Sequence, residues 1–119
     1  MKVLVADDSG VMRKIIVRSL NAVGVADVVE AADGAEGWEK FQAEPFDLVL
    51  TDWNMPNVNG LEFLKKIRES GSEVPVLMVT TEAEKGKVVE AIQAGVTDYL
   101  CKPFESDELR DKLDKYVAV

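Results

Sequence analysis

The sequence contains no histidine, and this absence removes whole classes of active site. Serine and cysteine triads that use histidine as the general base cannot form, and metal sites with imidazole ligands are also excluded. The single cysteine, Cys101, rules out an internal disulfide and a cysteine-rich zinc site. Because Cys101 follows Tyr99 and Leu100 in an apolar run, we expect a buried structural thiol rather than a nucleophile. Any chemistry must therefore use carboxylates, hydroxyls, lysine and backbone groups.

Basic residues and long apolar runs are also scarce. The 14 Lys and Arg residues are outnumbered by 22 Asp and Glu residues, which gives a formal net charge of -8 and argues against a nucleic-acid partner. No apolar run approaches the roughly 20 residues needed to span a bilayer. The short apolar stretch Lys2–Ala6 runs straight into two aspartates and lacks the length and cleavage site of a signal peptide. We therefore expect a cytoplasmic location and no nucleic-acid or membrane partner. A monomer is expected as well.

Strand-like and helix-like segments alternate five times along the 119 residues. The predicted strands are Lys2–Ala6, Asp27–Ala31, Asp47–Thr51, Val74–Val79 and Asp98–Cys101. Each is followed by apolar residues at helical spacing, the first such helix running from Ser9 to Val23. Repeated strand–helix units imply a parallel sheet with helices on both faces. No linker or repeat interrupts the pattern, so residues 1–119 are predicted to form one α/β domain.

Polar residues follow four of these strands at their carboxyl ends. The first strand is followed by Asp7 and Asp8, the third by Asp52, the fourth by Thr80 and the fifth by Lys102. Ligands bind outside the carboxyl ends of parallel strands, so we expect these side chains to share one rim. Two carboxylates ~4 Å apart repel by about 4 kcal/mol at an effective dielectric of 20. A bound cation or a shared proton usually relieves such crowding.

The donor types at this rim indicate magnesium and phosphoryl chemistry. An all-oxygen site suits Mg²⁺ or Ca²⁺, and few protein ligands with several waters favour Mg²⁺. A carboxylate beside Mg²⁺, a lysine and a hydroxyl can accept a phosphoryl group as a covalent nucleophile. The metal and the ammonium would neutralise charge on the transferring oxygens. Asp52 is the best candidate acceptor because the third strand should lie centrally, beside the first.

Each of these residues has an ordinary structural interpretation when it is taken alone. Asp7 and Asp8 could cap the helix that follows, and Asp52 could open an Asx turn. Thr80 could be a β-branched strand end, and Lys102 would usually be solvated. The functional interpretation depends on their joint position at one predicted rim.

Several motifs match a known family over the stretch from Lys2 to about Val117. They are Val5-Ala6-Asp7-Asp8-Ser9, Asp52-Trp53-Asn54-Met55-Pro56-Asn57 followed by Gly60, Val76-Leu77-Met78-Val79-Thr80, Ala94-Gly95 and Lys102-Pro103-Phe104. The chain thereby resembles receiver domains of bacterial two-component systems, and among them the single-domain chemotaxis regulators. The resemblance implies a doubly wound, five-stranded flavodoxin-like fold with strand order 2-1-3-4-5.

The resemblance also implies a role for each residue at the rim. Asp52 would take phosphate from a phosphohistidine on a partner kinase. Asp8 and Asp52 would bind Mg²⁺ through their side chains, Asn54 through its backbone carbonyl and Asp7 through water. Lys102 would pair with the phosphoryl group. Thr80 would hydrogen-bond to the same group and shift on phosphorylation.

Signal output and signal lifetime are implied by the same resemblance. Tyr99 would turn inward after phosphorylation and couple the site to the face formed by the fourth helix, fifth strand and fifth helix. The target would be a protein such as a flagellar motor switch component. Asn54 and Glu82 occupy positions that influence dephosphorylation, and a cis Lys102-Pro103 bond would aim the lysine into the site. The protein would be a phosphoacceptor rather than an enzyme, with self-phosphorylation from small donors and autodephosphorylation.

The same residues are compatible with other functions. A phosphorelay intermediate or a phosphate sink would have the same sequence features. A flavodoxin-like ligand-binding protein would need a phosphate-cradling loop after the first strand, where this chain has two aspartates. A phosphatase resembling the haloacid dehalogenase class would need a second aspartate at the position of Asn54.

Overall fold

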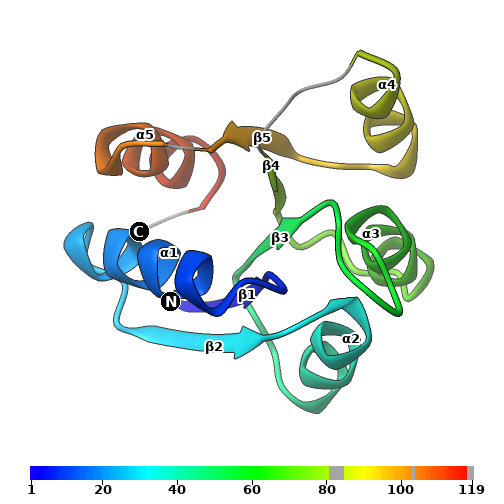
Figure 1. Cartoon of the computed structure of the whole chain (residues 1–119), viewed down its shortest axis with the longest axis horizontal. Coiled ribbons are helices and arrows are strands. Elements are labelled where there is room, and N and C mark those ends of the chain that lie inside the picture. Colours follow the sequence, from blue (N-terminus) through cyan, green and yellow to red (C-terminus); the bar gives the residue numbers. More distant parts are fainter. Residues whose placement is uncertain (81–84, 103, 118–119) are drawn as a thin grey trace.

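The computed structural model describes residues 1–80, 85–102 and 104–117. Its strands are β1 (Lys2–Ala6), β2 (Asp27–Ala31), β3 (Leu48–Asp52), β4 (Val76–Thr80) and β5 (Asp98–Cys101). Its helices are α1 (Gly10–Ala22), α2 (Gly34–Ala43), α3 (Gly60–Glu69), α4 (Lys85–Ala94) and α5 (Ser106–Tyr116). The strands form one parallel sheet in the order β2-β1-β3-β4-β5 (Figure 1). The predicted α/β class and strand order 2-1-3-4-5 are confirmed.

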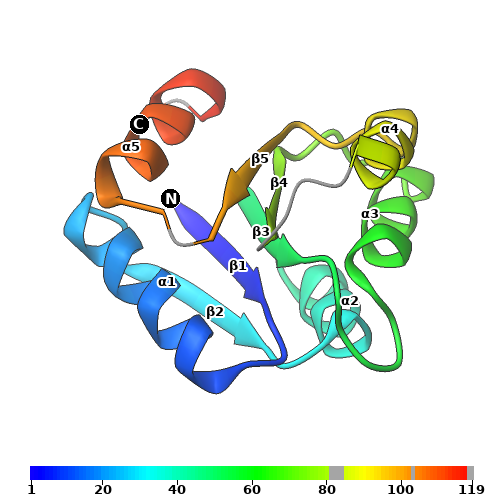
Figure 2. The same ribbon diagram turned by 45° about the horizontal axis from the view of Figure 1, so that its top comes forward.

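Helices cover both faces of the sheet (Figures 1 and 2). On one face α1 and α5 contribute Ile16, Leu20, Leu109 and Leu113 to a core with Val3, Val5, Leu50, Leu77 and Val79. On the other face α3 and α4 contribute Phe63, Leu64, Ile67 and Ala91 to a core with Leu4, Val49, Val76 and Met78. Partly buried aromatic residues of α2 pack against this second core. Because successive side chains of a strand point to opposite faces, each central strand contributes side chains to both cores.

The bounds of the third and fourth strands differ from the prediction, and the new end of each strand matters for the site. The third strand extends one residue further than expected, to Asp52, and the fourth begins at Val76 rather than Val74. Pro75, which precedes Val76, has no N–H to donate to a ladder. The fourth strand also extends to Thr80. Asp52 and Thr80 are therefore the last residues of their strands, which places both side chains at the rim.

The predicted burial of Cys101 is wrong. Its side chain is exposed, although the preceding Leu100 is only 2% exposed. Successive side chains of a strand point to opposite faces, and β5 is the edge strand of the five-stranded sheet, next to β4. In this edge strand Leu100 is therefore buried against the core, whereas Cys101, the last residue of the strand, is exposed to solvent.

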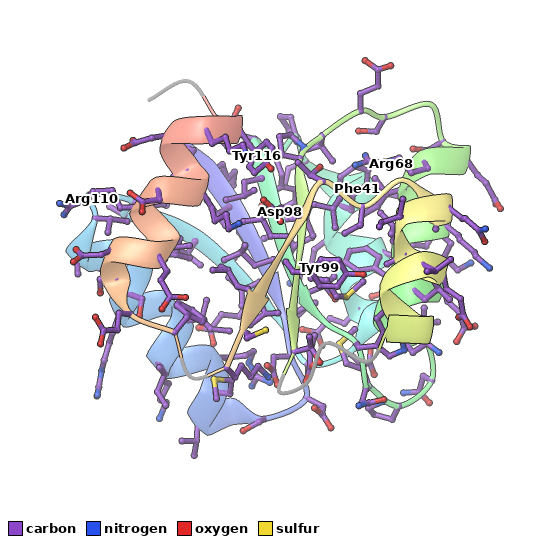
Figure 3. All side chains as sticks on the ribbon, turned by 90° about the horizontal axis from the view of Figure 1, so that it is seen from above. Phe41, Arg68, Asp98, Tyr99, Arg110 and Tyr116 are labelled. Atoms are coloured by element: carbon purple, nitrogen blue, oxygen red, sulfur yellow. The ribbon has the colours of Figure 1, made fainter. Side chains whose placement is uncertain are left out.

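The carboxylate of Asp98 fastens this edge strand to α5 (Figure 3 labels Asp98 and Tyr116). Its Oδ2 accepts hydrogen bonds from Lys112 Nζ at 2.8 Å and Tyr116 Oη at 2.6 Å, and its Oδ1 accepts the Tyr99 N–H at 2.8 Å. Burial alone would raise the pKa of Asp98, but the hydrogen bonds from Lys112, Tyr116 and Tyr99 outweigh it and lower that pKa. The network thus depends on an ionised Asp98.

A Tyr116→Phe variant is expected to lose about 1 kcal/mol of unfolding free energy at neutral pH, which is the usual net value of one hydrogen bond. Because the folded-state pKa of Asp98 is lowered, its stabilisation is complete above its unfolded pKa and disappears as pH falls through the folded pKa. The difference from the unaltered chain should therefore shrink as the pH falls through the lowered folded-state pKa of Asp98. Urea unfolding of both chains over a pH series measures it. A difference that stays constant with pH would contradict this account.

Candidate functional site

Strand register brings the predicted rim residues together. Ala6 of β1 lies opposite Thr51 of β3, so Asp7 and Asp52, the next residue of each segment, are neighbours. Thr80 of β4 lies opposite Cys101 of β5, and the N–H of Lys102 donates to the Thr80 carbonyl at 2.7 Å. The carboxyl ends of four adjacent strands thus present these groups at one edge of the sheet, as predicted.

Three carboxylates form the centre of the site. Asp7, Asp8 and Asp52 each place a ligand oxygen within 4.8 Å of the other two. Asp7 is fully buried, Asp52 is half-buried and Asp8 is exposed. Asp8 and Asp52 can therefore be reached from solvent, whereas Asp7 forms the floor of the cluster.

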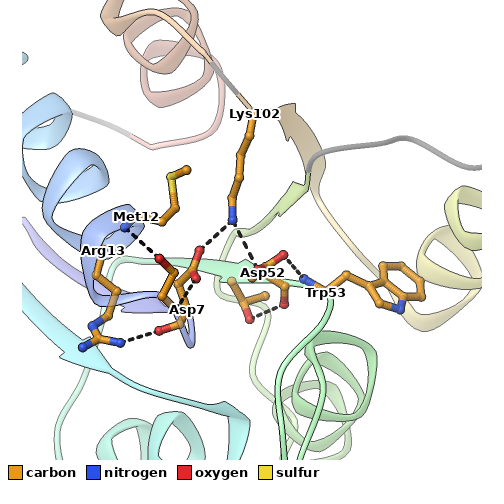
Figure 4. Close-up of polar contacts among 8 residues, drawn as sticks. Asp7, Met12, Arg13, Asp52, Trp53 and Lys102 are labelled. Carbon is orange, nitrogen blue, oxygen red and sulfur yellow. Dashed lines mark hydrogen bonds and ion pairs between the residues drawn. The ribbon is translucent and has the colours of Figure 1, made fainter.

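Lys102 is drawn into the cluster instead of being solvated (Figure 4). Its Nζ lies 2.7 Å from Asp7 Oδ2 and 3.2 Å from Asp52 Oδ2, and its side chain is only 7% exposed. One ammonium therefore serves two carboxylates of the cluster. With all four groups ionised, two negative charges stay unbalanced, a deficit that one divalent cation would remove.

The pKa of Asp52 is shifted by its position in this cluster. Burial raises the pKa of Asp52 above its ordinary value, and the negative charge of Asp7 adds to the effect. The Lys102 ammonium and the Trp53 N–H act in the opposite direction but do not outweigh burial. The charged form of Asp52 is thus destabilised by burial and by Asp7 more than it is stabilised by Lys102 and the Trp53 N–H.

The oxygens of the cluster fit a hard divalent cation. Asp7 Oδ1 accepts the Ser9 N–H at 2.9 Å, and Asp52 Oδ1 accepts the Trp53 N–H at 2.7 Å. Each carboxylate oxygen has two lone pairs, so these hydrogen bonds and the contacts with Lys102 leave capacity for a metal. An all-oxygen donor set of this charge suits Mg²⁺.

The other predicted site residues lie around this centre. Thr80 is 7% exposed at the end of β4, and Asn54 is exposed in the loop that follows β3. Tyr99 is partly buried against the core beneath α3 and α4, and burial raises its pKa (Figure 3). Glu82 and the predicted cis bond before Pro103 lie outside the described residues.

Sequence reasoning missed Arg13, which stabilises the start of the site. Arg13 Nη1 donates to the Asp7 carbonyl at 2.6 Å (Figure 4). Its Nε lies 3.3 Å from Glu30 Oε1. The Ser9 hydroxyl caps α1 by accepting the Met12 N–H at 3.2 Å. Arg13 therefore comes one turn after the cap, where a long side chain can reach back to the strand end. An arginine four residues after the cap Ser9, which itself follows Asp7 and Asp8, is the sequence pattern that could have indicated this contact.

Comparison with known proteins identifies the family. The response regulator receiver domain model matches residues 3–114. The chain belongs to this family. The predicted membership of two-component signalling proteins is thus confirmed.

This receiver domain has chemotaxis proteins among its relatives. It is 48% identical over 117 residues to chemotaxis protein CheY1 of Helicobacter pylori, which covers 96% of this chain and 94% of the relative. It is 45% identical over 117 residues to a CheY homologue of Campylobacter jejuni, with 96% and 90% covered. The solved structure of Vibrio cholerae CheY4 matches with a TM-score of 0.90 and 37% identity over 98% of each chain. A receiver domain from Clostridium thermocellum matches with a TM-score of 0.88 and 26% identity over 98% and 93%.

Among the helices of this receiver domain that the structure describes, none has the length and apolar content to cross a bilayer.

Proposed function

We propose that this receiver domain accepts a phosphoryl group on Asp52 from a histidine kinase, with Mg²⁺ as cofactor, and signals to a protein partner in chemotaxis. The observation that carries the proposal is the position of Asp52 within the carboxylate cluster and 3.2 Å from the Lys102 ammonium. The chain has no histidine, so a phosphohistidine donor must come from a partner.

Exposure and charge distinguish Asp52 from its two neighbours as the acceptor. The Asp7 side chain is 1% exposed, too little for a donor to reach it, whereas that of Asp52 is 14% exposed. Asp8 is exposed, but the ammonium of Lys102 contacts Asp7 and Asp52. Asp52 therefore combines access with a cation that can stabilise the transferring oxygens.

Each remaining residue has a defined part in the proposed transfer. Bound Mg²⁺, held by Asp8, Asp52 and the Asn54 carbonyl and contacted by Asp7 through water, would neutralise charge on the phosphoryl oxygens. An Asp52 oxygen forms the new bond to phosphorus, while the bond between phosphorus and the donor imidazole nitrogen breaks. Lys102 and the Thr80 hydroxyl then bind the phosphoryl oxygens on Asp52.

The proposed output surface is formed by α4, β5 and α5. Val89 and Ile92 of α4 are 53% and 62% exposed, an apolar pair one turn apart that a protein partner could cover. Tyr99 of β5 packs against the core beneath α3 and α4, on a strand of this surface that pairs with β4, whose last residue is Thr80. A change of its position would therefore reach the partner, for which a flagellar motor switch component is the proposed example. Asn54 and Glu82 would set the rate of autodephosphorylation.

Incubation with acetyl phosphate and Mg²⁺ followed by intact-mass measurement tests the acceptor. The unaltered chain should gain one phosphate-sized mass increment, and Asp52→Asn should gain none because the amide cannot act as the nucleophile. The control Asp111→Asn removes an exposed carboxylate of α5 and should label normally. An increment that persists in Asp52→Asn would show that another residue is the acceptor.

A further inference from the structure

The loop between β3 and α3 is fastened to the turn between β2 and α2 by one aspartate. Asp33 Oδ1 caps α2 by accepting the Glu36 N–H at 2.8 Å, and Asp33 Oδ2 accepts Asn57 Nδ2 at 2.8 Å. The Glu36 N–H and then the Asn57 side chain lower the pKa of Asp33. Both oxygens of this carboxylate are therefore engaged, one on each of two segments that are far apart in sequence.

The backbone at the same place reinforces this contact. The Gly34 N–H donates to the Val58 carbonyl at 3.0 Å, and a Cβ on Gly34 would lie 2.2 Å from that carbonyl oxygen. Asn57 has a φ of 66°, a left-handed conformation that Asn adopts more readily than most residues. The loop thus contacts the turn through the Asn57 side chain and the Val58 carbonyl, and the left-handed conformation of Asn57 sets the path of the backbone there.

The fastened loop is the one that leads away from Asp52. It is closed at its base by the Gly60 N–H, which donates to the Trp53 carbonyl at 2.8 Å. At the carboxyl end of the loop, Asn59 and Glu62 form a capping box that starts α3. Asn54 is exposed within this loop, three residues before Asn57. The position of the Asn54 carbonyl therefore depends on how Asn57 is held.

We propose that the Asp33–Asn57 hydrogen bond is a positioning clamp for the metal site, which holds the loop so that the Asn54 carbonyl can complete the ligand set of Asp7, Asp8 and Asp52. The inference depends on the Mg²⁺ site of the proposed function. Asp33 acts through Asn57 and the loop and does not itself contact the metal. Partners that orient metal ligands in this way typically affect metal affinity by about 10- to 100-fold.

The single substitution Asn57→Asp separates the effect of the clamp on Mg²⁺ affinity from a simple effect of charge. Asn57→Asp places two carboxylates against each other and breaks the hydrogen bond, while its added negative charge would by itself strengthen Mg²⁺ binding. Asp also tolerates the left-handed conformation, so the backbone is not strained by the change. The clamp therefore predicts about tenfold weaker Mg²⁺ binding, opposite in direction to the effect of charge.

The double variant Asp33→Asn/Asn57→Asp restores the bond with its direction reversed. The new amide in the turn can donate to the new carboxylate in the loop while its oxygen still accepts the Glu36 N–H. The net charge equals that of the unaltered chain, so Mg²⁺ affinity should return to within about twofold of the original if the hydrogen bond is what matters.

Isothermal titration with MgCl₂ measures the affinity of each chain, and thermal melts in EDTA show that each is folded. Asp111→Asn, which removes a carboxylate of α5, is the control for overall charge. Unchanged or tighter binding in Asn57→Asp, or a double variant as weak as that single variant, would overturn the clamp. Absence of Mg²⁺ binding by the unaltered chain would overturn the proposed metal site, and the clamp with it.

Discussion

Replacement of Lys102 by methionine is expected to lower the unfolding free energy of the metal-free chain by about 3 kcal/mol at neutral pH. Lys102 is 7% exposed and contacts both Asp7 and Asp52, so its loss leaves buried carboxylates without a counterion. Removal of one partner of a buried ion pair typically costs about 3–5 kcal/mol. The lower end applies here because Asp52 is 14% exposed and can take up a proton.

The pH dependence of this variant has a definite sign. Burial already raises the pKa of Asp52, and Lys102 is the main group that opposes the rise. Without Lys102 the folded-state pKa rises further above the unfolded value. A carboxyl with a raised folded-state pKa favours folding below its unfolded pKa, and this contribution is lost as pH rises through the folded pKa. The variant should therefore recover stability relative to the unaltered chain as the solution is acidified.

Added Mg²⁺ should stabilise the variant more than the unaltered chain, because without the Lys102 ammonium the carboxylates bind the cation more tightly and a ligand of the native state stabilises it by mass action. Urea unfolding in EDTA and in Mg²⁺ measures both effects. Lys112→Met is the matched control, since its ion pair with Asp98 is 29% and 23% exposed and should be worth at most about 1 kcal/mol. Equal losses in the two lysine variants would contradict the view that Lys102 neutralises a buried cluster.

The convergence at the rim was predictable because it follows from strand direction alone. Parallel strands share one carboxyl edge, so residues that end successive strands must meet there. That argument located Asp7, Asp52, Thr80 and Lys102 without knowledge of any side-chain position. The order of the strands, by contrast, came from the resemblance to receiver domains. The alternation of segments is compatible with several orders.

Contacts that cross between loops, or that depend on edge position, were not predictable. Lys102 would ordinarily be solvated, and only the actual path of the chain shows its ammonium between two carboxylates. The contact of Asp33 with Asn57 joins residues 24 positions apart through a turn and a loop, neither of which has a periodic pattern. Cys101 was misplaced because local hydrophobicity does not show which strand forms the sheet edge.

Gly60→Ala is expected to destabilise the chain by about 3 kcal/mol, although alanine favours helices and Gly60 is the first residue of α3. A Cβ at this position would lie 2.1 Å from the Asp52 carbonyl oxygen and 3.0 Å from the Trp53 Cα. Both are backbone atoms, so no change of rotamer can relieve the contact. The start of α3 must move away, which breaks the bond from the Gly60 N–H to the Trp53 carbonyl.

Gly10→Ala is the matched control, because Gly10 is likewise the first residue of its helix, α1. Its Cβ would meet Arg13 Nη2 at 3.6 Å, an ordinary contact, so this variant should gain about 0.4–1 kcal/mol from the reduced freedom of the unfolded chain. Urea midpoints of the two variants should thus shift in opposite directions.

Since the strain in Gly60→Ala falls on the peptide of Asp52, the folded fraction of the Gly60→Ala variant should also label more slowly with acetyl phosphate. Similar stability of the two variants would mean that α3 can shift without cost, and that its close contact with Asp52 does not hold the acceptor in place.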